Sequence, residues 1–326
     1  MSKTAAHLTQ SAPDLVDLLK DAPTNWGRWG ADDEVGSLNY LTPNEVLRGV
    51  AQIRDGHVFT LQRLIGSPYG DPVWPSRTPA LREMVMDESS WDAGGNGPEA
   101  AGGWHFADDK ISAFLQGSTQ YDALGHLWYD GQIWNGYDAR TTIGGLSKAS
   151  VEPIGTRGVV GRGVLLDIAR YRGKNSLDSG ETFDHEDLEK CATAQGLTIE
   201  PHDILLIRTN YLQRFFDNRD ESYSDFCEPG LVYSPELVEW FHTKEIPNLV
   251  TDTIANEVTN DPNNGASLVL HNALMRNLGV VFTEICDLEA LAEDCARDKR
   301  YSFLYTAAPL KIHEATGAPV NPIVIK

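Results

Sequence analysis

Residues 115–126 (LQGSTQYDALGH) carry the side chains best suited to chemistry. Asp122 and His126 stand four residues apart, and a carboxylate near an imidazole can bind a divalent cation or move a proton. Where a metal site would need further imidazoles, the sequence has Gln116 and Gln120. The stretch is therefore a working site with unusual ligands, a site that has lost its metal, or no site at all.

The pattern of this stretch allows two structural interpretations. An extended chain from 115 to 122 puts every second side chain on one face. The oxygen-bearing side chains on that face are Gln116, Ser118, Gln120 and Asp122. Such a row suits a polar site, but it is equally typical of a solvent-facing edge that ends in a turn at Gly125.

Three polar residues farther along the chain are candidates for the same chemistry. Glu284 lies within an apolar run (VVFTEI, 280–285) that favours a buried strand. Because a buried carboxylate without a partner is costly, Glu284 must face solvent, meet a partner or bind a cation. The same argument applies to Asp252, which follows the run NLV. His271 lies on the apolar face of a predicted helix, where it is either a buried core residue or a metal ligand.

The composition excludes several classes of function. With 326 residues and 41% hydrophobic content, the chain can bury a large core. Its formal charge of −20 repels nucleic acids and anionic membranes, so we expect neither as a partner. Its four cysteines have no CxxC spacing and indicate reduced thiols. Without a leader-like N-terminus or an apolar run near ~18 residues, the sequence predicts a cytoplasmic protein.

Strand and helix patterns alternate along the chain, which predicts an α/β fold with some parallel pairing. No repeat or linker divides the sequence, so we expect one domain over 1–326, with an N-terminal extension at 1–24 that contains a short amphipathic helix. The predicted helices are 43–54, 184–196, 234–246 and 265–279. The predicted strands are 157–169, 202–210, 247–252 and 280–285.

The segment 66–104 is rich in Gly, Pro, Asp and Trp and has little periodicity. A loop of this length in a compact domain is either a functional cover or a surface insertion. Trp91 and Trp104 flank its glycines and favour a lid.

These motifs resemble the cyclase family of metal-dependent hydrolases, which contains bacterial kynurenine formamidase and isatin hydrolase. The resemblance covers nearly the whole chain. NWGRWGADDEVGSLNYLTP is similar to the opening signature of the longer members, RGVLLDIA and HDILLIRTN to the central strands, and PLKIHEATGAPVNPIVI to the C-terminal segment. The resemblance implies a swivelling β/β/α fold with a mixed central sheet, and a homodimer or homotetramer.

The stretch QGSTQYDALGH is similar to the family motif HxGTHxDxPxH. Asp122 matches the aspartate and His126 the final histidine, while Gln116 and Gln120 stand at the other two histidine positions. Ser118 replaces the motif's glycine and Leu124 its proline. His271 and Glu284 match the family's later histidine and glutamate.

The resemblance thereby implies a set of site residues. As catalytic residues it implies His126, His271 and Glu284. As metal ligands it implies Asp122, Glu284, Gln116 and Gln120. As substrate-binding residues we expect Gln116, Gln120, Tyr121 and Trp104. Tyr121, Trp128 and the tryptophans of the segment 66–104 would form an aromatic wall, although they are equally explained as core.

The two glutamines change the expected cofactor. A neutral amide oxygen is a harder and weaker donor than imidazole, so zinc affinity should fall, and harder ions should be favoured. We expect a divalent metal, manganese, zinc or magnesium, or no metal at all because two motif histidines are glutamine.

Three functions follow from these residues. The first is a metal-dependent hydrolase of a small cyclic or aryl amide, imide or lactone, with an aromatic or cyclic small molecule as substrate. The second is a metal-independent acid–base cyclase, dehydratase or isomerase that uses the same pocket. The third is an inactive binding homologue.

Overall fold

The structure is a computed structural model that describes residues 12–68, 71, 74, 76–99, 101–213 and 227–326. The first eleven residues of the predicted N-terminal extension therefore lie outside the described part. Its remainder contains the short predicted helix, α1 (Leu15–Leu18). Within the described ranges, no helix combines the length and the apolar character needed to cross a membrane.

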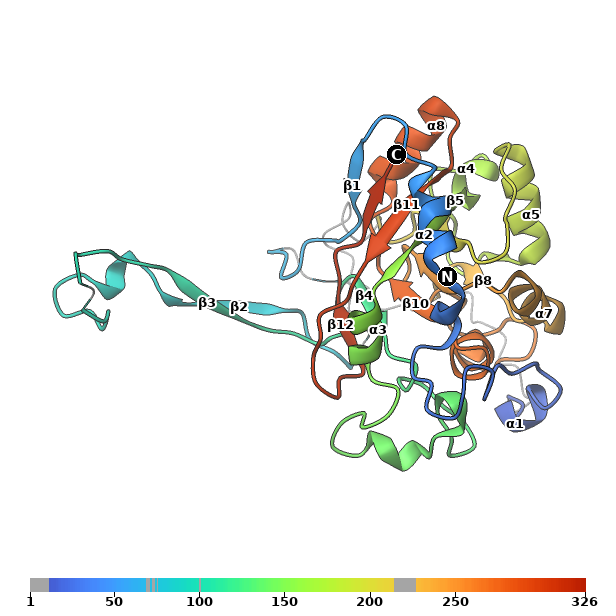
Figure 1. Cartoon of the computed structure of the whole chain (residues 1–326), viewed down its shortest axis with the longest axis horizontal. Helices are drawn as coiled ribbons and strands as arrows, with labels where there is room; N and C mark the ends of the chain where they lie inside the picture. Colours follow the sequence, from blue (N-terminus) through green and yellow to red (C-terminus); the bar gives the residue numbers. More distant parts are fainter. Residues whose placement is uncertain (1–11, 69–70, 72–73, 75, 100, 214–226) are drawn as a thin grey trace, which may run out of the picture.

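A nine-stranded mixed sheet forms the centre of the molecule (Figure 1). Its middle strands β5, β7, β9 and β10 are parallel, and antiparallel strands continue the sheet on both sides. In spatial order the strands are β1 (Val58–Thr60), β13 (Ile323–Ile325), β11 (Ser302–Ala307), β5 (Val159–Asp167), β7 (Ile204–Arg208), β9 (Asn248–Thr251), β10 (Val281–Glu284), β4 (Gln120–Asp122) and β12 (Gly317–Pro319). The predicted α/β fold with a mixed sheet is confirmed.

The four predicted strands are all present. The predictions 157–169, 202–210, 247–252 and 280–285 correspond to β5, β7, β9 and β10, each shorter than predicted. Nearly all of their side chains are buried. Continuous apolar runs are typical of strands covered on both faces, which is why these four could be recognised from the sequence.

Three predicted helices are also present, and each begins at a residue whose side chain caps it. Thr42, Asp184 and Ser234 accept hydrogen bonds from backbone N–H groups at the starts of α2, α5 and α7. In Figure 1, α5 and α7 lie at one edge of the molecule, while α2 crosses the sheet. The helices are α2 (Pro43–Val50), α3 (Val151–Arg157), α4 (Ile168–Tyr171), α5 (His185–Ala194), α7 (Pro235–Lys244) and α8 (Glu289–Asp298), with 3-10 turns at Gly36–Tyr40, Glu88–Ser90, Trp134–Gly136 and Ala139–Thr142.

The fourth predicted helix, 265–279, was expected as an α-helix and is instead a π-helix, η5 (His271–Asn277). Its wider turn alters which residues share a face, so the predicted α-helical face of His271, Leu274 and Leu278 was wrong. All seven residues of η5 are buried. Single π-helical turns are frequently found at functional sites, and His271 begins this one.

The prediction of a loop and lid over 66–104 needs correction from residue 81 on, where the chain forms a projecting hairpin. Residues 81–112, here called the arm, contain an antiparallel hairpin of β2 (Leu81–Met86) and β3 (Asp108–Ser112) that projects far from the body (Figure 1). Trp91 and Trp104 lie beyond these strands, toward the end of the arm, and do not cover the body from which it projects. A further small sheet pairs β6 (Thr182–Phe183) with β8 (Gly230–Leu231).

Gly49 allows α2 to lie directly on β5. A Cβ at this position would stand 2.6 Å from the backbone carbon and oxygen of Gly161. In an exposed helix a Gly→Ala change stabilises by ~1 kcal/mol. Here we expect Gly49→Ala to destabilise by about 1–3 kcal/mol, because the collision is with backbone. Urea unfolding measures the change, with the exposed Val50→Ala as control; a gain in stability would mean that α2 can move outward without loss.

Candidate active site

Antiparallel pairing of β4 with β10 brings the candidate residues together. Gln120 stands opposite Glu284 in this pair. Asp122 ends β4, Glu284 ends β10, and His271 begins η5. One ligand atom from each of Asp122, His271 and Glu284 lies within 4.8 Å of the other two, and all three residues are buried. The structure therefore assembles three of the residues predicted from the sequence into one cluster.

This cluster lies at a pocket of about 220 Å³ that also contains His126. Ionisable groups and apolar walls are combined in it. The lining residues are Trp74, Arg77, Asp122, His126, Leu127, Ile254, Ala255, Leu268, His271 and Glu284. The volume is below the ~300 Å³ at which pockets for drug-sized ligands begin, so the pocket suits a small molecule.

Glu284 is the most closely surrounded group of the site. Gln120 Nε2 donates to its Oε2 at 2.7 Å, and Asn256 Nδ2 donates to its Oε1 at 3.1 Å. His271 Nε2 lies 3.4 Å from the same Oε1. Burial raises the pKa of Glu284, and the nearby charge of Asp122 raises it further. Glu284 therefore retains a proton at higher pH than an ordinary glutamate does.

Glu257 fixes the orientation of His271. Its Oε1 lies 2.6 Å from His271 Nδ1, and its carboxylate also accepts the backbone N–H groups of Leu270 and His271. Because Nδ1 is hydrogen-bonded to Glu257, the other ring nitrogen, Nε2, faces Glu284. Burial alone would lower the pKa of His271, but the hydrogen bonds to Glu257 and Glu284 outweigh burial and raise it. A carboxylate behind a histidine is the usual support of a metal-ligating imidazole.

His126 has the opposite electrostatic environment. Burial lowers its pKa, an effect that the charge of Asp122 opposes and the charges of His271 and Arg77 reinforce. The imidazole is therefore neutral at neutral pH. A neutral imidazole at the pocket wall can accept a proton from water or from a substrate.

The donor atoms of the cluster fit a divalent cation. Asp122 Oδ1, Gln120 Oε1 and Asn256 Oδ1 are buried and have no hydrogen-bond partner among the described residues. Cation–oxygen bonds of ~2.0–2.6 Å place opposite ligands at most ~5 Å apart, which agrees with the 4.8 Å limit of the cluster. Two carboxylates and one imidazole are groups that divalent cations take as ligands in proteins.

Gln116 was predicted on an extended strand with Gln120 and Asp122, but residues 115–119 form turns and bends. Gln116 Nε2 donates to Thr316 Oγ1 at 3.1 Å, and its backbone oxygen accepts from Arg77. A Cβ on Gly317 would lie 2.6 Å from Gln116 Nε2 and 3.4 Å from Asp122 Oδ1. Gln116 is therefore beside the cluster but outside the pocket lining.

The structure does not bring Tyr121 or Trp104 to the pocket. Tyr121 points to the other face of β4 and is fully buried. Its hydroxyl forms hydrogen bonds with the side chains of Asn248 and Tyr305. Alternation along the strand requires this, because Gln120 and Glu284 meet on the opposite side. Trp104 is 59% exposed on the arm. The aromatic residue of the pocket is instead Trp74.

Asp252, the other carboxylate predicted to be buried, has hydrogen-bond partners. It is buried and accepts hydrogen bonds from the backbone and hydroxyl of Thr209 and from the backbone of Asn210. It is absent from the pocket lining. Asp252 therefore stabilises the ends of β7 and β9 and satisfies one of the three alternatives expected of it.

Three residues at or behind the site, Asn256, Glu257 and Arg77, were not predicted from the sequence. Asn256 and Glu257 follow β9, and an adjacent pair of polar residues after a buried parallel strand is a signal that could have identified them. Arg77 belongs to the aperiodic segment 66–104, where no pattern marks it, whereas Trp74 is one of the tryptophans of that segment expected in the aromatic wall.

Comparisons with known proteins agree with this architecture. The chain matches the model of the putative cyclase family over residues 56–258. A crystal structure described as a novel cyclase is 37% identical, with 93% of this chain and 100% of that chain covered and a TM-score of 0.83. No curated protein matches the chain.

Isatin hydrolases share the fold at lower identity. Isatin hydrolase A from Ralstonia solanacearum is 20% identical, with 87% and 98% of the two chains covered and a TM-score of 0.57. An isatin hydrolase bound to the product analogue thioisatinate is 17% identical, with the same coverage and TM-score. Because the family model spans more than half of its length, the chain belongs to the cyclase family.

Proposed function

We propose that this protein hydrolyses a small cyclic or aryl amide, imide or lactone with the help of a divalent metal. The observation that carries the proposal is the cluster of Asp122, His271 and Glu284, with their ligand atoms within 4.8 Å, beside a neutral His126. Membership of the cyclase family and the fold shared with isatin hydrolases support it.

Asp122, Glu284 and His271 would hold the metal, and the unpartnered oxygens of Gln120 and Asn256 are available as further ligands. Such a metal supplies a Lewis acid that polarises a carbonyl and lowers the pKa of water. Glu257 has a positioning role, since it keeps His271 Nε2 directed at the cluster.

The remaining steps belong to the chain's own side chains. His126 accepts the proton of the attacking water as the new C–O bond forms, and returns it to the leaving nitrogen or oxygen as the old bond breaks. Arg77, held by the backbone oxygen of Gln116, donates N–H groups to the oxygen on which negative charge develops. Leu127, Ile254 and Leu268 keep water from the apolar part of the substrate.

An acid–base reaction without metal is the second candidate. The observation that favours it is that Gln120 and Asn256 already satisfy both oxygens of Glu284. In this reaction His126 accepts a proton and Glu284, whose pKa is raised, donates one, in a cyclisation, dehydration or isomerisation.

Metal analysis combined with activity assays distinguishes these functions. The protein is purified without added metal, treated with chelator, and reloaded with manganese, zinc or magnesium. It is then assayed on formylated anilines, isatin-like imides and aromatic lactones. We expect activity that chelator removes and manganese restores. Turnover that is indifferent to chelator would support the acid–base reaction, and no turnover on any substrate would support an inactive binding homologue.

Manganese binding should release protons. The pKa values of His271 and Glu284 are both raised, so both groups carry protons to higher pH than usual, and ligation requires their loss. We expect affinity to increase with pH through neutrality, and calorimetry in two buffers of different ionisation enthalpy to detect the released protons. Asp122→Asn should abolish uptake, while the exposed Asp32→Asn should not; uptake without proton release would contradict the assigned ligands.

A histidine at position 120 should shift the site toward zinc. Gln120 Nε2 lies 2.7 Å from Glu284, so an imidazole there reaches the cluster. We expect Gln120→His to tighten zinc binding by roughly tenfold or more, measured by competition with a chelating dye, since imidazole is the better zinc ligand. Gln62→His, in a different cavity, is the control. Unchanged zinc affinity would show that position 120 does not contribute a ligand.

Arg77 should select ligands that carry a carboxylate. It lines the pocket, and guanidinium–carboxylate hydrogen bonds are among the stronger ones in proteins. For the manganese-loaded protein we expect Arg77→Met to weaken benzoate binding by about tenfold while leaving benzyl alcohol nearly unaffected. Calorimetry or ligand-observed NMR measures both, with Arg82→Met on the arm as control. Equal losses for the two ligands would assign Arg77 a structural role.

A further inference from the structure

Leu268 lines the pocket from an unusual backbone conformation. Its φ of 51° lies in the left-handed region, where a Cβ crowds the following carbonyl oxygen. Glycine and asparagine adopt this region at little cost, whereas a bulky residue such as leucine is rare there. A glycine would satisfy the turn more easily, so the leucine side chain contributes something that the turn itself does not require.

The backbone on both sides of Leu268 is held by hydrogen bonds. Its N–H donates to the carbonyl oxygen of Thr259 at 3.1 Å, and its own carbonyl oxygen accepts from Asn272 Nδ2 at 2.9 Å. One residue earlier, Ser267 pairs with Asn260 in an antiparallel bridge, and its hydroxyl donates to the side-chain oxygen of Asn260 at 2.6 Å. A strained residue persists where its surroundings determine its conformation in this way.

The same contacts fix Leu268 relative to the cluster of ionisable groups. Leu268 precedes His271 by three residues, and Asn272, which holds its carbonyl oxygen, directly follows His271 in η5. The leucine side chain is partly exposed, and it borders the pocket that contains His271. An apolar side chain is therefore fixed at a set distance from the proposed metal ligands.

Leu268 has no role in the apolar core of the described residues. Of the other aliphatic residues that line the pocket, Leu127 packs against the main core cluster, and Ile254 belongs to a smaller cluster with Leu212 and Ile285. Leu268 is a member of neither cluster and packs against neither of them. The side chain of Leu268 thus serves the pocket, whereas those of Leu127 and Ile254 serve the core as well.

The size of the pocket indicates what this side chain excludes. An apolar cavity of ~150 Å³ is large enough to bind benzene. The pocket has about 220 Å³, so it has room for one ring and a small polar substituent beside the cluster. Two fused rings with the same substituent require the space that the Leu268 side chain borders.

We propose that Leu268 is the specificity-determining residue of this pocket and limits the substrate to a single ring. The proposal rests on the proposed hydrolysis and narrows its substrate class. Because Thr259 and Asn272 hold the backbone of Leu268, this wall does not withdraw as a flexible loop would. A larger ligand therefore meets a fixed obstacle, and removal of the side chain should admit it.

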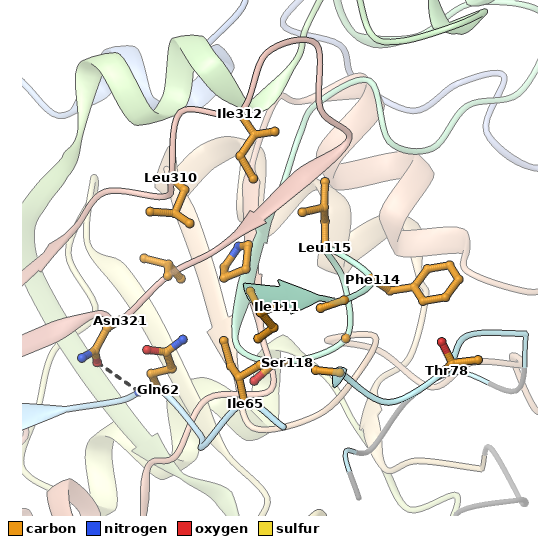
Figure 2. A pocket seen from close by; sticks show the side chains of 15 residues that line it. Gln62, Ile65, Thr78, Ile111, Phe114, Leu115, Ser118, Leu310, Ile312 and Asn321 are labelled. Atoms are coloured by element: carbon orange, nitrogen blue, oxygen red, sulfur yellow. Dashed lines mark hydrogen bonds between the residues drawn. The ribbon is translucent and has the colours of Figure 1, made fainter. Parts of the chain in front are cut away.

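Another cavity, of about 490 Å³, provides a matched control. It shares no lining residue with the pocket, and none of its lining residues is charged. In Figure 2, Leu310 lies on one side of it and Phe114 on the other, with Ile65 and Ile111 between them. Leu310→Ala therefore makes the same chemical change as Leu268→Ala at a place where the pocket is not enlarged.

Calorimetry with benzoate and 2-naphthoate in the presence of manganese measures the size limit. For wild type we expect 2-naphthoate to bind at least about tenfold more weakly than benzoate. Leu268→Ala should strengthen 2-naphthoate binding by about tenfold and leave benzoate within about threefold, while Leu310→Ala changes neither. Benzoate should displace 2-naphthoate from Leu268→Ala, since both occupy one pocket. An unchanged ratio of the two affinities in Leu268→Ala, or no binding of either ligand to any of these proteins, overturns the proposal.

Leu268→Gly separates the effect of the backbone from that of the side chain. Both Leu268→Gly and Leu268→Ala remove the obstacle, so both should admit 2-naphthoate. Only glycine relieves the left-handed conformation, so we expect Leu268→Gly to have a urea midpoint at or above that of Leu268→Ala. At an ordinary position the order is reversed, because glycine is the more flexible residue in the unfolded chain. A midpoint for Leu268→Gly clearly below that of Leu268→Ala would contradict the conformation on which the assignment depends.

Turnover distinguishes failure of this proposal from failure of the proposed hydrolysis. N-formylaniline and N-formyl-2-naphthylamine are compared as substrates, and Leu268→Ala should raise kcat/KM for the naphthyl compound relative to the phenyl compound by about tenfold. If neither compound is hydrolysed but 2-naphthoate binding depends on residue 268, the hydrolysis is wrong and the size limit stands. If N-formylaniline is hydrolysed and the kcat/KM ratio is the same in wild type and Leu268→Ala, the hydrolysis stands and the size limit is wrong.

Discussion

The site depends on the burial of Glu284 at the end of a sheet strand. A carboxylate that is 3% exposed must be surrounded by donors or cations, and three neighbours of Glu284 supply them, while Asp122 adds a like charge. Gln120 comes from the adjacent strand, Asn256 from the segment after β9, and His271 from η5. Three separate parts of the fold are thereby held around one group, and its elevated pKa follows from the same confinement.

The surroundings of the two histidines of the pocket shift their pKa values in opposite directions. His271 has carboxylates at both ring nitrogens, so its pKa is raised. His126 is partly exposed, and its pKa is lowered by its desolvation and by the positive charges of His271 and Arg77, despite Asp122. His271 is therefore suited to a fixed position in the cluster, and His126 is suited to accepting and donating protons. Such a division is typical of acid–base sites.

The sequence predicted the central strands and three of the helices correctly, because continuous apolar runs and capping residues such as Asp184 and Ser234 are local signals. It failed where the outcome depended on distant contacts. Neither the π-helical turn at His271 nor the turns at 115–119 were predicted. The arm, whose two strands are joined by a glycine-rich stretch, gave no periodic pattern that would have indicated strands.

For the site, the sequence alone determined which residue types were available: Asp122, His126, His271 and Glu284, and glutamine at two positions of the motif. The tertiary structure decided which of them meet. It placed Gln120 against Glu284, turned Tyr121 into the core, and added Asn256 and Glu257. The reason is physical: alternation and capping act over a few residues, whereas a cluster is formed by strand pairing between segments far apart in the chain.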